Sequence, residues 1–193
     1  MIRTALRSPQ LAQPTRVTAA SAAVVRALAA VIVTLNQQII VLQGQVEANF
    51  LAHPDAEIVL SQPGLGLILG ARVLAEFGDD PAQYASAKAR KNYAATSPIT
   101  RQSGKRKTVM ARYVHNDRLR DTLRLQAFVA LGQSPGARAY YDALRRRGTG
   151  HEAALRQLAS KLVGVLHGCL KTRTLYDETI AWPTPDKQSP AAA

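Results

Sequence analysis

Residues 56–77 read AEIVLSQPGLGLILGARVLAEF, two short apolar stretches separated by PGLG at positions 63–66. Pro63 disfavours a continuous helix, while Gly64 and Gly66 permit a tight turn that side chains would obstruct. The pattern predicts a helix, a turn and a second helix, with free backbone N–H groups where the second helix begins. The alternative is a turn that only joins two core helices.

This arrangement resembles the helix-hairpin-helix motif of DNA-binding proteins that do not recognise sequence. The start of a helix carries a partial positive charge and unpaired N–H groups, which bind phosphate without contacting base edges. We therefore expect Gly64 and Gly66 to contact nucleic acid.

The composition of the chain favours a polyanionic partner. Its 193 residues hold 25 Lys and Arg against 13 Asp and Glu, a formal net charge of +12. Such a charge suits nucleic acid. The hydrophobic fraction of 47% is too high for a wholly disordered basic chain, so we expect a globular core.

Cysteine and histidine usage argues against disulfides and metals. The single cysteine, Cys169, excludes an intramolecular disulfide and a multi-cysteine zinc site, and it fits a reducing, cytoplasmic compartment. Because it falls on the apolar stripe of a C-terminal helix, we expect a buried side chain rather than a nucleophile. The four histidines lack ligand spacing. We expect no metal and no other cofactor in this chain.

The N-terminal region predicts a leader and a long helix. Residues 1–16 contain Pro9 and Pro14 without apolar periodicity, so we expect a flexible leader. Within residues 17–53, apolar side chains recur every 3 or 4 positions, which predicts an amphipathic, coiled-coil-like helix. The members of this apolar stripe are Val24, Leu28, Val31, Leu35, Ile39, Leu42, Val46 and Phe50.

A single helix cannot bury such a stripe, so another surface must cover it. A second copy of the chain would give a homo-oligomer; the alternative is that the stripe covers the chain's own core. Four polar side chains interrupt the apolar run, so we do not expect a membrane span. They are Asn36, Gln37, Gln38 and Gln43.

The basic residues concentrate in residues 88–120, which hold ten Lys and Arg and one Asp. These cations repel one another unless an anion joins them. Because the middle of the segment lacks apolar periodicity, it predicts a basic loop or short strands rather than a core helix. The alternative is a solvated charged face.

The C-terminal part predicts three helices, over Arg118–Gly132, Ala137–Arg147 and His151–Thr172. Three arginines followed by Gly148 mark the end of the second one. We therefore expect a mainly α protein with one helical domain over residues 55–177. Residues 178–193, rich in proline and alanine, predict a disordered tail.

Six motifs in order carry a resemblance to one family: PGLG, AEFGD at 75–79, YAATSP at 93–98, RQSGKRK at 101–107, HNDRLR at 115–120 and ARAYYDALRRRG at 137–148. Between Glu57 and Asp177, the chain resembles the C-terminal transposase domain of DEDD-type bacterial insertion-sequence transposases, the bridge-RNA-guided recombinases. The resemblance implies a helical domain after a coiled coil, DNA as substrate, and a guide RNA as a further partner. It also implies that Ser103 is the nucleophile that attacks a DNA phosphodiester.

The residues around Ser103 suit that role. Phosphoryl transfer develops negative charge that cations stabilise, and Gly104 lets the backbone approach a phosphate closely. Without the resemblance, Ser103 would be interpreted as a surface serine in a basic arm. The expected nucleic-acid contacts are Gly64, Gly66, Arg101, Gly104, Lys105, Arg106, Lys107, Arg112, Asn116, Arg118 and Arg120.

Members of the resembled family also carry an N-terminal domain with four acidic residues that bind divalent metal. No carboxylate cluster occurs in residues 1–54, so we expect a truncated or split transposase whose metal comes only with that domain. The alternative function is a non-catalytic, sequence-nonspecific DNA-binding module. An RNA-binding structural protein also fits the charge, but an aromatic fraction of 5% disfavours recognition by base stacking.

Overall fold

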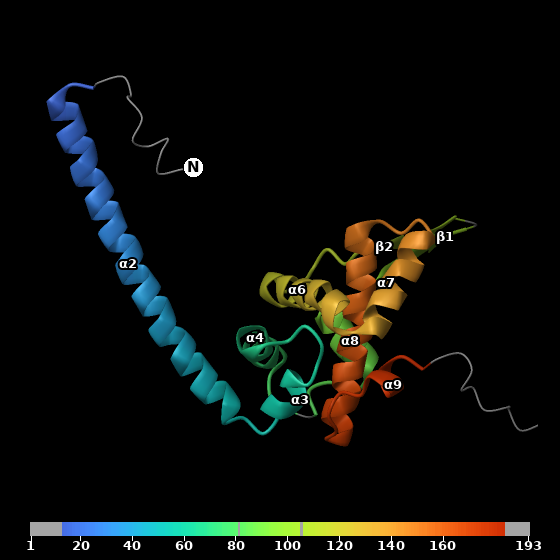
Figure 1. Cartoon of the computed structure of the whole chain (residues 1–193). Helices are drawn as coiled ribbons and strands as arrows, with labels where there is room; N and C mark the ends of the chain where they lie inside the picture. Colours follow the sequence, from blue (N-terminus) through green and yellow to red (C-terminus); the bar gives the residue numbers. More distant parts are fainter. Residues whose placement is uncertain (1–12, 81, 105, 184–193) are drawn as a thin grey trace, which may run out of the picture. The chain divides into compact units, whose positions relative to one another are not determined.

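The computed structural model describes residues 13–80, 82–104 and 106–183, and the side chain of Lys107 is not described. Within these residues the chain is mainly α with one two-stranded sheet, which confirms the predicted class. The chain divides into two compact units, a first unit of residues 1–45 and a second unit of residues 46–193. The elements in Figure 1 are α2 (Thr15–Leu51), α3 (Ala56–Leu60), α4 (Leu67–Phe77), α5 (Ala87–Tyr93), β1 (Ile99–Ser103), β2 (Arg106–Met110), α6 (Asp117–Gln133), α7 (Pro135–Arg146), α8 (His151–Thr172) and α9 (Glu178–Ala181).

Helix α2 is continuous, as predicted, but its apolar surface is wider than the predicted stripe. Exposed side chains outside the stripe include Val25, Ile32, Val33, Ile40 and Val41. By length and composition alone, α2 is apolar enough to cross a membrane, which is a weak indication for a single helix near the N-terminus. Residues 1–12 of the predicted leader lie outside the described residues, and its last two residues, Thr15 and Arg16, belong to α2, so the helix begins earlier than predicted.

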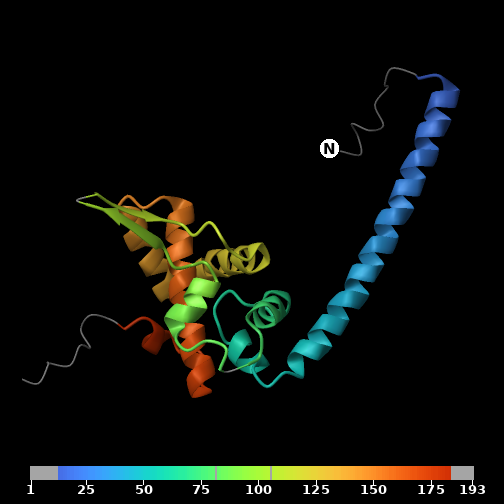
Figure 2. The same cartoon turned by 180° about the vertical axis from the view of Figure 1, so that it is seen from behind.

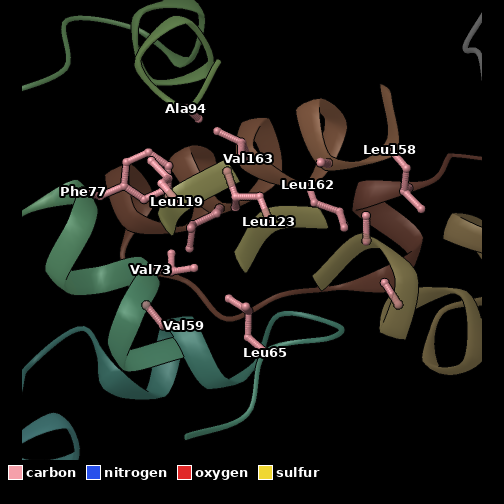
Figure 3. Close-up of a cluster of buried hydrophobic side chains, with 14 of the residues drawn as sticks. Val59, Leu65, Val73, Phe77, Ala94, Leu119, Leu123, Leu158, Leu162 and Val163 are labelled. Atoms are coloured by element: carbon pink, nitrogen blue, oxygen red, sulfur yellow. The ribbon is translucent and has the colours of Figure 1, made fainter. Parts of the chain in front are cut away.

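The second unit is built around α8. Its leucines at 155, 158, 162 and 166 recur every three or four residues and are at most 1% exposed, so one face of α8 is fully buried. Helices α5, α6 and α7 pack against α8, and α4 packs against α6 (Figure 3). Cys169 is buried on α8, as predicted.

The predicted order of a helix, a tight turn and a second helix is present in α3 and α4, and the turn packs against α6. Gly64 has a φ of +81°, and a Cβ there would lie 2.2 Å from the carbonyl oxygen of Gln126. The Gly64 N–H donates to Gln133 Oε1 at 2.7 Å, and Gln126 Nε2 donates to the Pro63 carbonyl at 3.3 Å. This close approach fixes α3 and α4 onto α6, and it requires glycine at position 64.

The three predicted C-terminal helices are confirmed with small shifts at their ends. Helix α6 begins after Asn116, and α7 begins after Ser134, whose hydroxyl accepts the Ala137 N–H at 3.0 Å. Pro135 occupies the first turn of α7, where its missing N–H costs nothing. Helix α7 ends with Arg145 and Arg146, cations that complement the helix dipole.

The C-terminal boundary differs from the predicted tail of residues 178–193. Residues 178–181 form α9, and Trp182 packs over Gly136, where a Cβ would lie 2.2 Å from the Trp182 ring. Glu178 Oε1 accepts the Gly136 N–H at 2.7 Å and the Ser134 hydroxyl at 2.9 Å. An aromatic ring and a hydrogen-bonded carboxylate hold this segment to α7, and composition could not reveal these contacts. Residues 184–193 of the predicted tail lie outside the described residues.

Candidate nucleic-acid interface

The middle of the basic segment forms a β-hairpin whose tip extends beyond the helices of the second unit (Figure 2). Strands β1 and β2 pair antiparallel, from Ile99 opposite Met110 to Ser103 opposite Arg106. Gly104 has a φ of +55°, which suits the first position of a two-residue hairpin turn. The segment was predicted to form a loop or short strands, and it forms two short strands. Every described side chain of these strands except that of Ile99 is exposed.

The pairing register determines which hairpin residues share a face. Side chains alternate along each strand, so Arg101, Ser103 and Arg106 lie on one face. Residues directly opposite each other have Cβ atoms about 4.5–5.5 Å apart, which brings Ser103 and Arg106 side by side. Among the described residues, neither arginine forms an ion pair, and the Ser103 hydroxyl has no hydrogen-bond partner. The serine therefore shares a face with two exposed cations that can bind an anion.

Two of the predicted contacts on the hairpin cannot be placed. Lys105 lies outside the described residues, and Lys107 is described only by its backbone position opposite Gln102. Their contacts with nucleic acid stay predictions.

A cleft of about 620 Å³ lies at the base of the hairpin. Thr96 precedes β1 and Arg112 follows β2, and both line this cleft together with residues of α6 and α8. The charged and titratable side chains that line it are Arg112, His115, Arg120, Asp121, Arg124, Glu152 and Arg156.

One ion pair in the cleft is bidentate. Arg124 donates two hydrogen bonds of 2.7 Å to the two carboxylate oxygens of Glu152. The hydrogen bonds from Arg124 lower the pKa of Glu152, and the same bonds raise the pKa of Arg124. This pair contributes little net charge, so the positive character of the cleft rests on the other arginines.

Arg112 and Arg120 are held in the cleft by side-chain contacts. Arg112 Nη2 donates to Asn92 Oδ1 at 3.0 Å, and its Nε is buried without a partner in the described chain. Arg120 lies 2.5 Å from His115 Nε2 and 3.1 Å from the Asp117 carboxylate. A phosphate in this cleft would offset the cost of burying the Arg112 guanidinium.

The remaining predicted contacts occupy different kinds of position. Gly64 is buried and its N–H is already bonded, so it is a packing residue, whereas Gly66 is exposed at the start of α4. Asn116 links two helices: its Oδ1 accepts the Leu119 N–H at 3.2 Å and its Nδ2 donates to Glu76 Oε2 at 2.5 Å. Both amide atoms of Asn116 are thus engaged within the fold. Arg118 is exposed on the first turn of α6.

Sequence inspection did not identify Arg124, Glu152 or Arg156 as part of this region. They come from α6 and α8, outside the basic segment, and no motif distinguishes them from other surface charges. Arg90, in contrast, belongs to the basic segment but is buried on α5. In the part of the chain that the structure describes, no group of three or more His, Cys, Asp or Glu could hold a metal ion.

Comparison of the sequence with known proteins relates the chain to one family. The family model described as Transposase IS116/IS110/IS902 family matches residues 56–142, which run from α3 into α7. The chain is 50% identical over 137 residues to the mini-circle IS117 protein of Streptomyces coelicolor, covering 71% of this chain and 33% of that protein. It is 36% identical over 157 residues to the 42 kDa protein of insertion element IS900 of Mycobacterium paratuberculosis, covering 81% and 39%.

A third relative is the 43.6 kDa protein of insertion element IS110 of Streptomyces coelicolor, 31% identical over 157 residues, with 80% of this chain and 38% of that protein covered. The chain thus spans about one third to two fifths of the length of these curated relatives. The matched residues include the AEFGD and HNDRLR motifs, which contact each other through Glu76 and Asn116. They also include the hairpin with Ser103. Residues 56–142 therefore form a transposase domain of the IS116/IS110/IS902 family.

Proposed function

We propose that this chain acts in DNA transposition, with the hairpin and the cleft at its base binding the phosphates of duplex DNA. The supporting observation is the cross-strand pair of Ser103 and Arg106 at the tip of an exposed hairpin in a transposase domain. Phosphate contacts carry no base information, so the proposed binding is largely independent of sequence.

In the proposed reaction, Ser103 is the nucleophile of strand exchange. Its Oγ forms a bond to a DNA phosphorus while the bond from that phosphorus to a deoxyribose oxygen breaks. The serine proton leaves to a base, and the departing deoxyribose oxygen takes up a proton. Arg101 and Arg106 stabilise the negative charge that spreads over the phosphoryl oxygens. The described residues do not supply the base, and no step is assigned to a metal ion in this chain.

The experiment is a covalent-complex assay on radiolabelled insertion-sequence ends. The acidic domain of a family member is supplied in trans with divalent metal, because the proposed activity is that of a whole family protein, which includes this domain. The wild-type chain is expected to form a phosphoserine link to DNA, and Ser103→Ala is expected to abolish it with nearly unchanged DNA affinity. Arg106→Ala should weaken both. A Ser103→Ala protein that still forms the link would exclude Ser103 as the nucleophile.

A second candidate function is a non-catalytic DNA-binding module. It is favoured by one observation, that the Ser103 hydroxyl has no hydrogen-bond partner among the described residues. In that case no covalent complex forms with the wild-type chain, while Arg106→Ala still weakens binding.

The proposal extends to partners and location. We infer that the chain associates with itself through α2, acts in the cytoplasm at the nucleoid and does not insert in the membrane. A guide RNA is proposed as a further partner because of the resemblance to bridge-RNA-guided recombinases.

A further inference from the structure

Arg90 carries a positive charge into the core of the second unit. Its side chain is only 5% exposed, and its guanidinium carbon lies 5.0 Å from the centre of the Phe77 ring and 4.6 Å from that of Tyr84. Burial lowers the pKa of Arg90, yet arginine stays protonated in proteins at every pH at which they fold. A full positive charge is therefore held against two aromatic rings.

The described residues do not neutralise this charge. Asp55, the acidic residue that acts on Arg90 through space, is ion-paired with Arg173. The Tyr84 hydroxyl donates to the carbonyl oxygen of Phe77 at 3.0 Å, and Arg90 Nε is buried without a partner in the described chain. Aromatic rings attract a cation but do not replace its hydration, so an unpaired buried arginine is costly.

Arg90 lines a cavity of about 960 Å³ that α8 closes on one side. Two further basic groups line this cavity from α8, His167 and Lys171. Burial lowers the pKa of His167, with the neighbouring cations adding to the effect, and its Nδ1 is also buried without a described partner. The other charged or titratable groups that line the cavity are His53, Asp55, Asp79, Asp80, Tyr84 and Arg173.

None of the three carboxylates that line the cavity pairs with Arg90, and Asp55 is ion-paired with Arg173. Asp79 and Asp80 are exposed, and Asp80 Oδ1 already accepts the Ala82 N–H at 2.8 Å. Their charges are screened by water, whereas the charge of Arg90 is not. The lining thus holds three carboxylates and three Lys or Arg side chains, and Arg90 is the deeply buried cation among them, without a carboxylate partner in the described chain.

We propose that this cavity binds a small phosphate-type anion, with Arg90 as its counter-ion. A guanidinium binds phosphate oxygens through a planar pair of N–H groups, and the aromatic rings hold its plane in place. Because Arg90 lines a recess of the helical unit rather than the exposed hairpin, the ligand is a free phosphate or a small phosphate monoester rather than a DNA duplex. This site is separate from the hairpin, and it does not depend on the proposed transposition activity.

The test is thermal unfolding of the full chain in inorganic phosphate against chloride, at matched pH and ionic strength. A ligand that binds only the folded state at one hundred times its Kd increases the folding equilibrium constant about 100-fold. We expect a saturable, phosphate-specific stabilisation that is absent in Arg90→Met and retained in Arg106→Gln. An equal response to phosphate and chloride in the wild-type chain, or an unchanged phosphate response in Arg90→Met, overturns the proposal.

Because Arg90→Met alters the core, a second pair of variants keeps the test decisive. Lys171→Gln removes an exposed cation that lines the cavity, and Lys88→Gln removes one on α5 that does not line it. Phosphate affinity, followed by 31P line broadening, is expected to fall several-fold in Lys171→Gln and to stay unchanged in Lys88→Gln. Equal affinities in both variants and the wild-type chain overturn the site. Repeating the titration with a nucleoside monophosphate distinguishes a monoester ligand from free phosphate.

Discussion

The backbone N–H of Gly64 donates a hydrogen bond to Gln133 Oε1 over 2.7 Å, although the two residues are 69 positions apart. One of the two N–H groups expected to bind phosphate is therefore used to join the α3–α4 turn to the end of α6. Nucleic-acid contacts from this turn are left to Gly66 and the first residues of α4.

Gly64→Ala is expected to lower the free energy of unfolding by about 2–4 kcal/mol, since large losses follow from strain at a special backbone conformation. A Cβ would lie 2.2 Å from the Gln126 carbonyl oxygen, where φ is also +81°. Urea unfolding measures the change. The matched control is Gly66→Ala, where a Cβ meets nothing within 4 Å, and it should cost less than about 1 kcal/mol. Equal losses in the two variants would contradict this account of the turn.

The salt dependence of DNA binding tests the hairpin. If four to six phosphates are neutralised, the slope of log K against log salt is about −4 to −5, and removing one phosphate contact reduces its magnitude by about 1. Arg101→Gln and Arg106→Gln should each show this reduction in fluorescence anisotropy titrations. Arg26→Gln on α2 serves as the control with the same change in net charge. A slope near zero in the wild-type chain would exclude phosphate binding by the basic segment.

Glu178 is expected to make the fold sensitive to acid. Burial raises the pKa of Glu178, but hydrogen bonds from Tyr176, Gly136 and Ser134 outweigh it, so its pKa lies below the ordinary value of 4.5. A carboxyl group whose pKa is lower in the folded state contributes stability above its unfolded pKa, and this contribution disappears as the pH falls through the folded pKa.

Glu178→Gln should therefore destabilise the protein at pH 7 by about 1–2 kcal/mol and reduce the loss of stability between about pH 5 and pH 3. Denaturant unfolding across this pH range gives both quantities. Glu57→Gln, at an exposed position of α3, provides the comparison. A pH profile of Glu178→Gln that is parallel to that of the wild-type chain would rule out the contribution of this carboxylate.

Helix α2 is expected to mediate self-association. Replacing Leu35 and Ile39 by lysine introduces two charges into the apolar stripe, and sedimentation velocity should show a smaller species than the wild-type oligomer. The control adds lysines at Gln37 and Gln38, outside the stripe. A wild-type chain that is already monomeric would exclude association, and one that requires detergent to stay in solution would favour membrane insertion of α2 instead.

The helices were predictable where local pattern determines them. The leucines of α8 recur with helical spacing, so its bounds follow from His151 to Thr172, and PGLG marks the turn before α4. Contacts between distant segments were not predictable. Arg90 belongs by residue type to the surface, and its position against the rings of Phe77 and Tyr84 depends on how α5 packs, which no local pattern encodes.

The residues of the candidate site were likewise predictable where they follow one another in the sequence and unpredictable where packing brings them together. Ser103 and its neighbouring arginines follow from one continuous motif, and strand pairing then places Arg106 opposite the serine. Arg156 joins the cleft from α8 only after the helices pack, and a lone arginine on a long helix gives no signal of that position.

The packing of Trp182 over Gly136 also sets a condition on biosynthesis. The ring and the Glu178 carboxylate complete the environment of α7, yet the ribosome makes them after every helix from α2 to α8. While these residues are still in the exit tunnel, most of α8, which lies directly before them in the chain, is in the tunnel as well, so the start of α7 cannot yet be secured. A released chain that ends at Asp177 should thus remain sensitive to protease near Gly136, and the full chain should resist cleavage there.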